Sequence, residues 1–217
     1  MIIPKLHYIS QGNSPKEHLE NIQKACTSGI ELVQLRLKNI SEKKFLKLST
    51  SAREITSHFQ TRLIINDHYK IAKAIKADGV HLEKSDVCPT IARKHLYTWQ
   101  MIGGTANTLQ DCEILLDKEV DYITLGPYRV EITKDNLNPP LGLNGYTAII
   151  ENLKTETPII GAGGMTIKDV TDVLETGVSG ITVSGEITRN FDSIKIFNGC
   201  RVKKIRRKKY KRFRALK

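Results

Sequence analysis

The sequence has few cysteines, and no spacing that would pair them. Cys26, Cys88, Cys112 and Cys200 are widely separated and include no Cys-x-x-Cys motif. A disulfide framework or a thiolate zinc site needs cysteines at patterned spacings, so neither is expected. We therefore expect reduced thiols in a cytoplasmic protein that has no cysteine-bound metal.

The sequence also lacks a long hydrophobic run and a recognisable nucleophile. A membrane-spanning helix needs about 20 apolar residues in succession, and no stretch approaches that length. The opening segment Met1-Ile2-Ile3-Pro4 is too short to be the core of a signal peptide. The six histidines show no metal-ligand spacing, and no Ser/His/Asp or Cys/His set stands out. These absences disfavour a membrane partner and covalent catalysis by a serine or cysteine.

The strong positive charge lies at one end of the chain. The net charge is +11, from 34 Lys and Arg against 23 Asp and Glu. Residues 201–217 hold 11 of the basic residues and no acidic one, so residues 1–200 are formally neutral. We expect one domain over residues 1–198 and a basic tail over residues 199–217. The charge therefore says nothing about the partner of the main domain.

Three interpretations of the tail remain open. Tyr210 and Phe213 are interleaved with cations, a pattern compatible with binding to the phosphate backbone of nucleic acid. Val202, Ile205, Phe213 and Leu216 fall near one face of a helical wheel, so the tail also fits an irregular last helix or a disordered segment. An altered end of the coding sequence is the third interpretation. We favour a tail without specific function, and nucleic acid is the less favoured partner.

Short apolar, β-branched runs alternate with helical stretches along the main domain. Such continuous apolar runs are typical of parallel strands that are buried on both faces. Strand–helix units repeated eight times close most simply as a phosphate-binding (β/α)8 TIM barrel, whose usual length of about 250 residues is somewhat above the 217 present. An open doubly wound sheet is disfavoured because no Gly-x-Gly-x-x-Gly follows the first run. The expected strands are Lys5–Ile9, Glu31–Arg36, Arg62–Asn66, Gly79–Leu82, Gln100–Gly103, Asp121–Leu125, Pro158–Gly161 and Gly180–Ser184.

The connecting segments carry signals for helix starts and ends. Ser14 precedes Pro15 and lies three residues before Glu17, which predicts a capping box, and Gly29 would end that helix. Ser41 can cap a helix over residues 42–58. Further starts are expected where an acid follows a threonine by three residues, at Thr108 with Asp111 and at Thr166 with Asp169, the latter helix ending at Gly177.

Charged and amide residues follow the second, third and fourth expected strands. Alternation places Gln34, Arg36 and Lys38 on one side of the second strand. The active sites of these barrels lie at the C-terminal ends of the strands, where two neighbouring cations would repel each other unless an anion lies between them. The residues that follow the next two strands are Asn66, Asp67 and Asp86. Because Mg2+ favours one or two carboxylates plus phosphate oxygens, the set suggests Mg2+ held together with a diphosphate.

Glycines dominate the ends of the later strands. Gly-rich turns after the seventh and eighth strands are where such barrels hold phosphate on backbone N–H groups. The Pro/Gly/Asn-rich segment 135–145 is expected to be a long loop, and such loops are often lids. His81, inside an apolar strand, is expected to be a satisfied core residue. The residues of interest are Gly103, Gly104 and Thr105 after the fifth strand, Thr133 and Lys134 after the sixth, Gly163 and Gly164 after the seventh, and Ser184 and Gly185 after the eighth.

Taken in order, these motifs resemble those of the thiamine phosphate synthase family. Residues 33–38 resemble its V-Q-L-R-x-K motif, residues 64–67 its I-I-N-D, and residues 78–86 its D-G-V-H-L-G-x-x-D. Residues 121–127 with Thr133 and Lys134 resemble D-Y-x-x-x-G-P…T-K, and residues 158–164 resemble P-I-x-A-x-G-G. The similarity extends over roughly residues 5–190.

The resemblance implies an enzyme that joins a pyrimidine methyl diphosphate to a thiazole ethyl phosphate, giving thiamine phosphate and diphosphate. It implies that Arg36, Lys38, Asn66 and Lys134 bind the leaving diphosphate, with the three cations as catalytic residues. It also implies that Asp67 and Asp86 hold an Mg2+ cofactor. The other substrate contacts that it implies are Gln34 to the pyrimidine, Thr105 to the diphosphate or pyrimidine, and Thr133, Gly163, Gly164, Ser184 and Gly185 to the thiazole phosphate.

The chain departs from the family pattern at several positions. Glu83 replaces the Gly expected after His-Leu, and Asn107 replaces a common His after the fifth strand. Arg129 replaces an aromatic residue, and Glu131 replaces the first Thr of T-x-T-K. A carboxylate at Glu131 would repel a thiazole phosphate, and we expect Arg129 to compensate by pairing with it. Glu186 also makes the end of the eighth strand differ from the family's usual small apolar-Ser pair.

Two other enzymes on the same barrel are alternatives. A thiazole tautomerase-like relative needs no Mg2+ and uses a His base after the fifth strand, where this chain has Asn107. Another phosphate-substrate enzyme is compatible because such barrels host many chemistries. The residues implied to bind diphosphate and metal favour the synthase. We expect small-molecule substrates as partners, and a homo-oligomer is compatible with the sequence.

Overall fold

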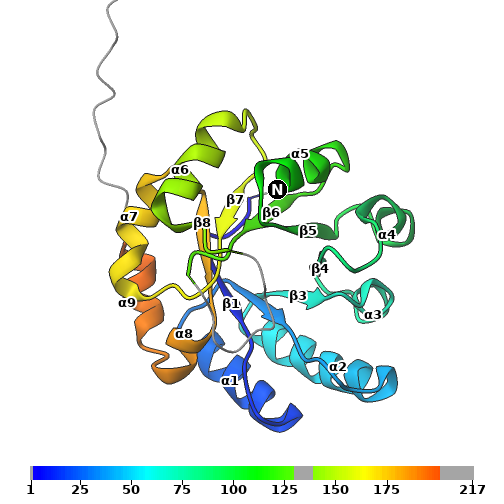
Figure 1. Cartoon of the computed structure of the whole chain (residues 1–217). Coiled ribbons are helices and arrows are strands. Elements are labelled where there is room, and N and C mark those ends of the chain that lie inside the picture. The colour runs from blue at the N-terminus through cyan, green and yellow to red at the C-terminus, as the bar shows by residue number, and fades with distance from the viewer. Residues whose placement is uncertain (1, 130–138, 201–217) are drawn as a thin grey trace, which may run out of the picture.

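The structure, a computed structural model, describes residues 2–129 and 139–200. Its parallel strands form a closed barrel in sequence order, which confirms the (β/α)8 TIM barrel expected from the sequence (Figure 1). The predictions for Glu131, Thr133, Lys134 and the tail 201–217 lie outside the described residues. The strands are β1 Leu6–Ile9, β2 Leu32–Leu35, β3 Arg62–Asn66, β4 Gly79–Leu82, β5 Met101–Ala106, β6 Tyr122–Leu125, β7 Ile159–Gly161 and β8 Gly180–Val183.

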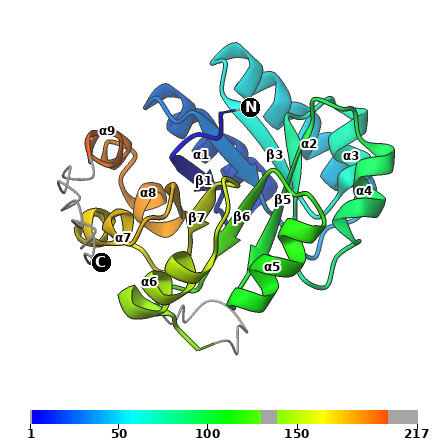
Figure 2. The same ribbon diagram turned by 90° about the horizontal axis from the view of Figure 1, so that it is seen from above.

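The helices lie outside the ring of strands (Figure 2). Within the part of the chain that the structure describes, no helix combines the length and the apolar character needed to cross a membrane. The helices are α1 Pro15–Thr27, α2 Glu42–His58, α3 Tyr69–Ala74, α4 Pro89–His95, α5 Leu109–Asp117, α6 Gly142–Asn152, the 3-10 turn η1 Ile167–Asp169, α7 Val170–Glu175, α8 Gly185–Arg189 and α9 Ser193–Gly199.

Most helix starts and ends follow the signals in the sequence. The Glu17 N–H donates to Ser14 Oγ at 3.2 Å, but the Glu17 carboxylate accepts from the Asn13 N–H at 2.6 Å, so the capping box predicted at Ser14 is half formed. Thr108 with Asp111, and Thr166 with Asp169, form complete boxes. Gly29 follows α1 with a φ of 88°, a conformation that glycine adopts at no steric cost.

The fifth strand is longer than expected. It was predicted to end at Gly103, but β5 continues to Ala106, so Gly104 and Thr105 lie within the strand. A Cβ atom on Gly103 would lie 2.1 Å from Cζ of Tyr122. Gly103 is therefore needed to make room for the Tyr122 ring inside the barrel, and the glycine pair of this strand has a packing role.

The loop that we predicted over residues 135–145 ends earlier than expected. α6 begins at Gly142, because the chain is anchored there by packing and hydrogen bonding. Leu141 and Leu143 pack against the hydrophobic core, and the Leu141 N–H donates to the Pro127 carbonyl at 2.8 Å. Local composition gave no sign of these contacts with the end of β6.

The barrel interior changes from apolar to polar along the strand direction. Leu32, Ile64 and Met101 form a small buried cluster of their own, separate from the large core between strands and helices. Two residues further along the same strand faces are Gln34, Asn66 and Gly103. Beyond Gln34 comes Arg36, so the C-terminal ends of the strands carry the charged side chains.

Candidate active site

β2 carries two cations to the C-terminal end of the barrel. The Arg36 N–H donates to Ser10 Oγ at 3.2 Å, which ties the end of β2 to the residue after β1. Lys38 follows Arg36, and its side chain is 54% exposed. Gln34, predicted to contact a pyrimidine, lies deeper in the barrel with 5% exposure and hydrogen-bonds to the Tyr122 side chain.

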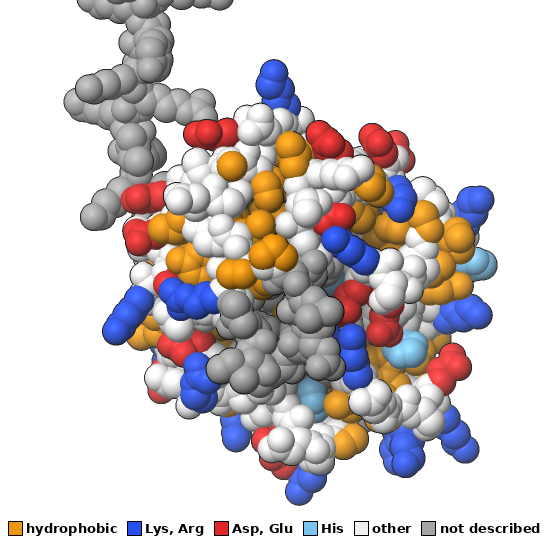
Figure 3. All heavy atoms as spheres, viewed as in Figure 1, with side chains coloured by type: hydrophobic (Ala, Val, Ile, Leu, Met, Phe, Trp, Pro, Cys, Tyr) orange, Lys and Arg blue, Asp and Glu red, His pale blue; other side chains and the backbone are white. Residues whose placement is uncertain are grey.

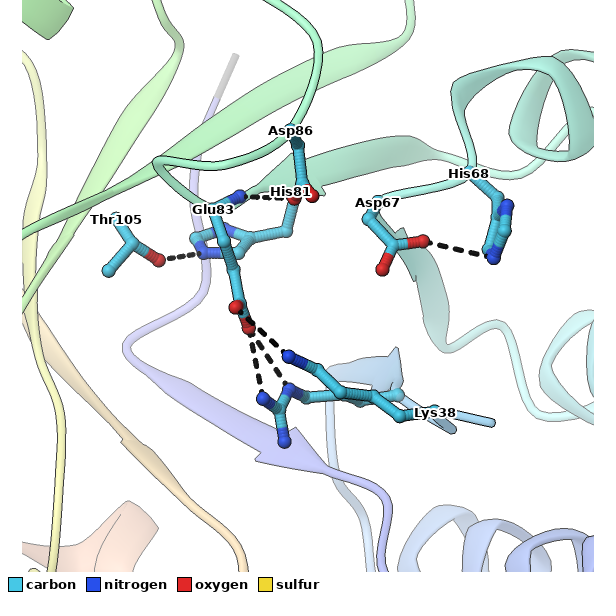
Figure 4. Close-up of polar contacts among 8 residues, drawn as sticks. Lys38, Asp67, His68, His81, Glu83, Asp86 and Thr105 are labelled. Carbon is cyan, nitrogen blue, oxygen red and sulfur yellow. Dashed lines mark hydrogen bonds and ion pairs between the residues drawn. The ribbon is translucent and has the colours of Figure 1, made fainter. Parts of the chain in front are cut away.

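Glu83, which follows β4, contacts both of these cations. Arg36 Nε and Nη2 donate to Glu83 Oε1 at 3.2 and 3.1 Å, and Lys38 Nζ donates to Glu83 Oε2 at 3.3 Å. Figure 4 shows the Glu83 side chain pointing toward Lys38. Burial alone would raise the pKa of Glu83, but the two cations outweigh burial and hold the pKa below its ordinary value. The anion that the cation pair requires is therefore Glu83 in this structure.

Asp67 and Asp86 follow the next two strands after β2, which are β3 and β4. Asp67 follows β3 with a φ of 60°, and its N–H donates to the His81 carbonyl at 2.8 Å. The Asp67 carboxylate lies 3.1 Å from Nε2 of His68. Asp86 Oδ2 accepts the Glu83 N–H at 2.6 Å, which fixes the turn after β4. Both predicted metal ligands thus lie at the same end of the barrel.

The carboxylates of this region influence one another. Burial raises the pKa of Asp67, and Asp86 and Glu83 raise it further, whereas His68 and Lys38 lower it. In Figure 4 the Asp67 carboxylate is joined to the His68 ring by a dashed line. Among residues 2–129 and 139–200, no group of three His, Cys, Asp or Glu side chains is arranged to hold a metal ion. Two mutually repelling carboxylates nevertheless fit Mg2+, which takes its other ligands from phosphate and water.

A buried hydrogen-bond network lies beneath the charged residues. Thr105 Oγ1 is 2.8 Å from His81 Nε2, and the Tyr122 hydroxyl is 3.2 Å from His81 Nδ1. His81 is 3% exposed, which confirms that it is a satisfied core residue. Tyr122 was missed in the sequence because a tyrosine inside an apolar strand gives no functional signal. Through His81, this buried hydroxyl helps to fix the orientation of Thr105.

The turn after β7 is built on two glycines. Gly163 has a φ of 97° and Gly164 a φ of 66°. A Cβ atom on Gly163 would lie 2.7 Å from the Pro127 Cα, so this turn packs tightly against the residues after β6. The Arg129 N–H donates to the Gly163 carbonyl at 3.2 Å. Within the described residues the Gly163 N–H has no hydrogen-bond acceptor, so it can donate to an anion.

Arg129 is engaged by an acid from another part of the chain. Its Nη1 donates to Asp169 Oδ2 at 2.9 Å, and its Nη2 donates to Asp169 Oδ1 at 2.5 Å. Burial alone would raise the pKa of Asp169, but hydrogen bonds from Thr166 and Arg129 hold it below its ordinary value. The predicted partner of Arg129 was Glu131, which lies outside the described residues. Asp169 already compensates the guanidinium charge beside the Gly163 turn.

Ser184 and Asn107 make hydrogen bonds that hold the barrel together. The Ser184 hydroxyl donates to the Ile9 carbonyl at 2.9 Å, which uses its single proton. Asn107 Nδ2 donates to the Gly126 carbonyl at 2.5 Å, and its N–H donates to Asp111 at 2.9 Å. Ser184 therefore joins β8 to β1, and Asn107 joins the ends of β5 and β6.

The site residues fall into two groups. The charged half contains Arg36, Lys38, Asp67, Glu83 and Asp86, from the ends of β2, β3 and β4. The backbone half contains Gly163, Gly164, Ser184 and Gly185, from the ends of β7 and β8. Figure 3 shows basic and acidic side chains next to one another near the centre of the face seen in Figure 1. The arrangement offers cations and carboxylates on one side and backbone donors on the other.

The chain is similar to known proteins of one family. Residues 6–187 match the protein family described as thiamine monophosphate synthase. The chain is 42% identical to the thiamine-phosphate synthase of Flavobacterium johnsoniae over 86% of its own length and 89% of the relative's. It is 34% identical to the thiamine-phosphate synthase of Bacteroides fragilis, covering 87% and 94% of the two chains.

A solved structure shares the fold. The thiamine phosphate pyrophosphorylase of Pyrococcus furiosus superposes with a TM-score of 0.78, covering 90% of this chain and 96% of that one. Its sequence identity is 24%, so this similarity supports only the barrel fold.

Proposed function

The chain belongs to the thiamine monophosphate synthase family, and from this we infer that it is a transferase of thiamine biosynthesis. Its reaction is the condensation of 4-amino-2-methyl-5-(diphosphomethyl)pyrimidine with 4-methyl-5-(2-phosphoethyl)thiazole. The products are thiamine phosphate and diphosphate. The substrates are therefore small molecules that each carry phosphate. A cytoplasmic location and a homo-oligomeric state stay predictions.

The observation that carries the proposal is the set of charges in the charged half. Arg36 and Lys38 both contact one carboxylate, and Asp67 lies in the field of Asp86 and Glu83. Cations placed this way suit the oxygens of a diphosphate. Asp67 and Asp86 would hold Mg2+, which when bound would supply further positive charge to those oxygens.

The proposed chemistry needs positioned donors. The bond between the pyrimidine methylene carbon and a diphosphate oxygen breaks, and the thiazole nitrogen forms a bond to that carbon. Arg36, Lys38, Asn66 and Lys134 would stabilise the charge that develops on the departing diphosphate. Preorganised donors of this kind contribute about 3–4 kcal/mol each in other enzymes. The lack of a recognisable protein nucleophile in the sequence agrees with this route.

We assign the thiazole phosphate to the backbone half. The open Gly163 N–H supports this assignment, because backbone donors in glycine turns bind phosphate in other barrels. Gly164, Gly185, Thr133 and Ser184 would complete the cradle. Because the Ser184 hydroxyl donates to Ile9, we expect Ser184 to act through its backbone or after a rotation of its hydroxyl.

A tautomerase-like reaction is not favoured by any contact in the described residues. Such a reaction needs a general base within reach of the proton that it removes. Asn107 takes the position of that base, and its amide donates to Gly126 at 2.5 Å. An amide does not accept a proton at neutral pH, so Asn107 cannot perform the step.

One assay tests the function. The purified full chain is mixed with both phosphorylated precursors and Mg2+, and thiamine phosphate and diphosphate are measured. We expect the two products in equal amounts, and we expect EDTA to abolish turnover. Absence of thiamine phosphate would contradict the proposal, whereas turnover that survives EDTA would contradict only the role of the metal.

A further inference from the structure

We propose that Glu83 is a built-in competitor of diphosphate, with its carboxylate occupying the anion site between Arg36 and Lys38. The inference rests on the proposed function, which assigns this site to the leaving diphosphate. Glu83 would then determine how tightly the substrate diphosphate is held and how readily the product diphosphate leaves. It is a specificity-determining residue that the family pattern, with Gly at this position, does not provide.

The contacts of Glu83 are those that a bound anion would make. One carboxylate oxygen accepts from Nε and Nη2 of Arg36 at 3.2 and 3.1 Å, and the other accepts from Nζ of Lys38 at 3.3 Å. Both oxygens are thus used, and both cations are directed at one group. A diphosphate oxygen cannot take the same positions until this carboxylate has moved away.

The backbone of Glu83 is fixed, while its side chain can rotate. The Glu83 N–H donates to Asp86 Oδ2 at 2.6 Å, and the Asp86 N–H donates to the Glu83 carbonyl at 3.1 Å. Residue 83 is not among the described residues with a positive φ, so glutamate stands there without backbone strain. Its side chain is 29% exposed. Displacement by a stronger anion therefore needs only side-chain rotation, and the turn that carries Asp86 stays in place.

The charges around Glu83 favour a role in which its carboxylate competes with diphosphate rather than helps to bind it. Formally, Arg36 and Lys38 stand against the three carboxylates of Asp67, Glu83 and Asp86, and the charges of Glu83 and Asp86 both act on Asp67. In the absence of Mg2+, these five described side chains therefore carry an excess of negative charge that a diphosphate would meet on arrival. Removing the Glu83 charge frees two cations and removes one repulsion. We expect this gain to be modest, because part-exposed ion pairs are weak.

Glu83 has an alternative role with the opposite consequence. A carboxylate that contacts two flexible cations can also hold them in position for a substrate, as a purely structural residue would. In that case its removal loosens Arg36 and Lys38 and weakens diphosphate binding. The direction of the change in affinity distinguishes the two roles.

The test is the binding of inorganic diphosphate to the full chain, measured by calorimetry in EDTA and again with Mg2+. The variants are Glu83→Gln, which keeps the shape, and Glu83→Gly, which restores the family residue. We expect the Kd in EDTA to fall roughly tenfold in both, as expected for the loss of two part-exposed ion pairs. A Kd that is unchanged, higher or beyond measurement in both variants overturns the proposal.

Two further proteins make the result specific. Glu20→Gln removes one negative charge from an exposed pair with Lys16 on α1, and its Kd should equal that of the unmodified chain. Combining Glu83→Gln with Arg36→Gln should reduce the gain, because one of the two released cations is gone. An undiminished gain overturns competition at this site. Formation of thiamine phosphate by the unmodified chain is a separate readout, so failure of this inference and failure of the proposed function are distinguished.

Discussion

The charged half and the backbone half hold phosphate groups, on our proposal, by different means. In the charged half the binding groups are long side chains, and Arg36 and Lys38 contact Glu83 through their ends. In the backbone half the binding groups are main-chain donors, set by the left-handed conformations of Gly163 and Gly164. The Arg129 guanidinium, which donates to the Gly164 carbonyl of that turn, is already paired with Asp169.

Because of this difference, substitutions in the two halves should act by different means, through charge in one and through backbone geometry in the other. A substitution in the charged half changes which ions are compensated while leaving the backbone where it is. A substitution in the backbone half moves the donors themselves, because a Cβ atom on Gly163 has no room beside Pro127. The charged half should therefore respond to metal and salt, and the backbone half to steric change.

The largest effect is expected from Asp67→Asn. This change keeps the side-chain size but removes a proposed Mg2+ ligand, and a Lewis-acid metal contributes several kcal/mol, so kcat/KM should fall about 100-fold or more. Thermal stability should change little because Asp67 lies at the barrel mouth. Asp172→Asn on the exposed face of α7 is the matched control and should keep full activity. Equal activity of the two variants in Mg2+ would rule out the metal role of Asp67.

The next effect tests the backbone half through Gly163→Ala. The added Cβ would lie 2.7 Å from the Pro127 Cα and 3.0 Å from the Tyr128 N, at a φ of 97°. Strain of this kind costs about 1–3 kcal/mol and overpacking a similar amount. We expect KM for the thiazole phosphate to rise at least about tenfold, with a smaller change for the pyrimidine diphosphate.

Gly199→Ala is the control for that prediction. Apart from its chain neighbours and its own helix backbone, no atom of the described residues lies within 4 Å of a Cβ placed on Gly199. This variant should bind both substrates as the unmodified chain does. If Gly163→Ala raises both KM values equally, the division of the site into two halves is wrong.

The fold and the charged half were largely predictable from the sequence. Apolar runs marked the strands, and polar residues at their ends marked the mouth, because parallel strands bring their C-terminal ends together. Arg36, Lys38, Asp67 and Asp86 were identified in this way. The sequence also signalled Glu83 as unusual, but its contact with Arg36 spans 47 positions and depends on how β2 and β4 lie across β3.

The backbone half was less predictable. The glycines of the β7 turn were recognisable as a phosphate-type motif, yet the pairing of Arg129 with Asp169 spans 40 positions and had no local signal in the sequence. The Gly163 N–H, which has no acceptor among the described residues, takes its direction from the dihedral angles of the turn, and residue type alone does not determine those angles. Gly103 shows the converse, since a glycine near the mouth accommodates the Tyr122 ring and has no part in the site.

A third, smaller effect is expected from Asp169→Asn, which tests what Arg129 does beside the backbone half. The variant loses the carboxylate that caps η1 and pairs with Arg129, and we expect a loss of about 1–3 kcal/mol in unfolding free energy. The fold lowers the pKa of Asp169, so its carboxylate adds to folding stability at any pH above the ordinary pKa of an aspartate. This added stability is lost as the pH falls through the folded pKa. The variant should thus lose less stability than the unmodified chain below about pH 4.

Chemical denaturation across pH measures this difference. Burial lowers the pKa of His7 to about 4 from 6.5, so both proteins should lose stability between those values as the pH falls. Only the difference in stability between the two proteins at pH values below that range is specific to Asp169. Asp192→Asn, which breaks an exposed pair with Lys195, is the control and should leave the curve unchanged. Parallel curves for Asp169→Asn and the unmodified chain would contradict the assigned role.

The smallest effect separates the two halves without any substitution. Raising NaCl from about 0.1 to 0.5 M shortens the screening length from about 10 Å to less than half that value, which weakens contacts between exposed charges. Lys38 is 54% exposed, so KM for the pyrimidine diphosphate should rise about threefold. On our proposal the thiazole phosphate would bind to backbone donors beside a guanidinium that is already paired with Asp169, so its KM should change by less than about twofold. Equal salt dependence for both substrates would mean that a further cation also serves the backbone half, and Lys134 would then be the first residue to substitute.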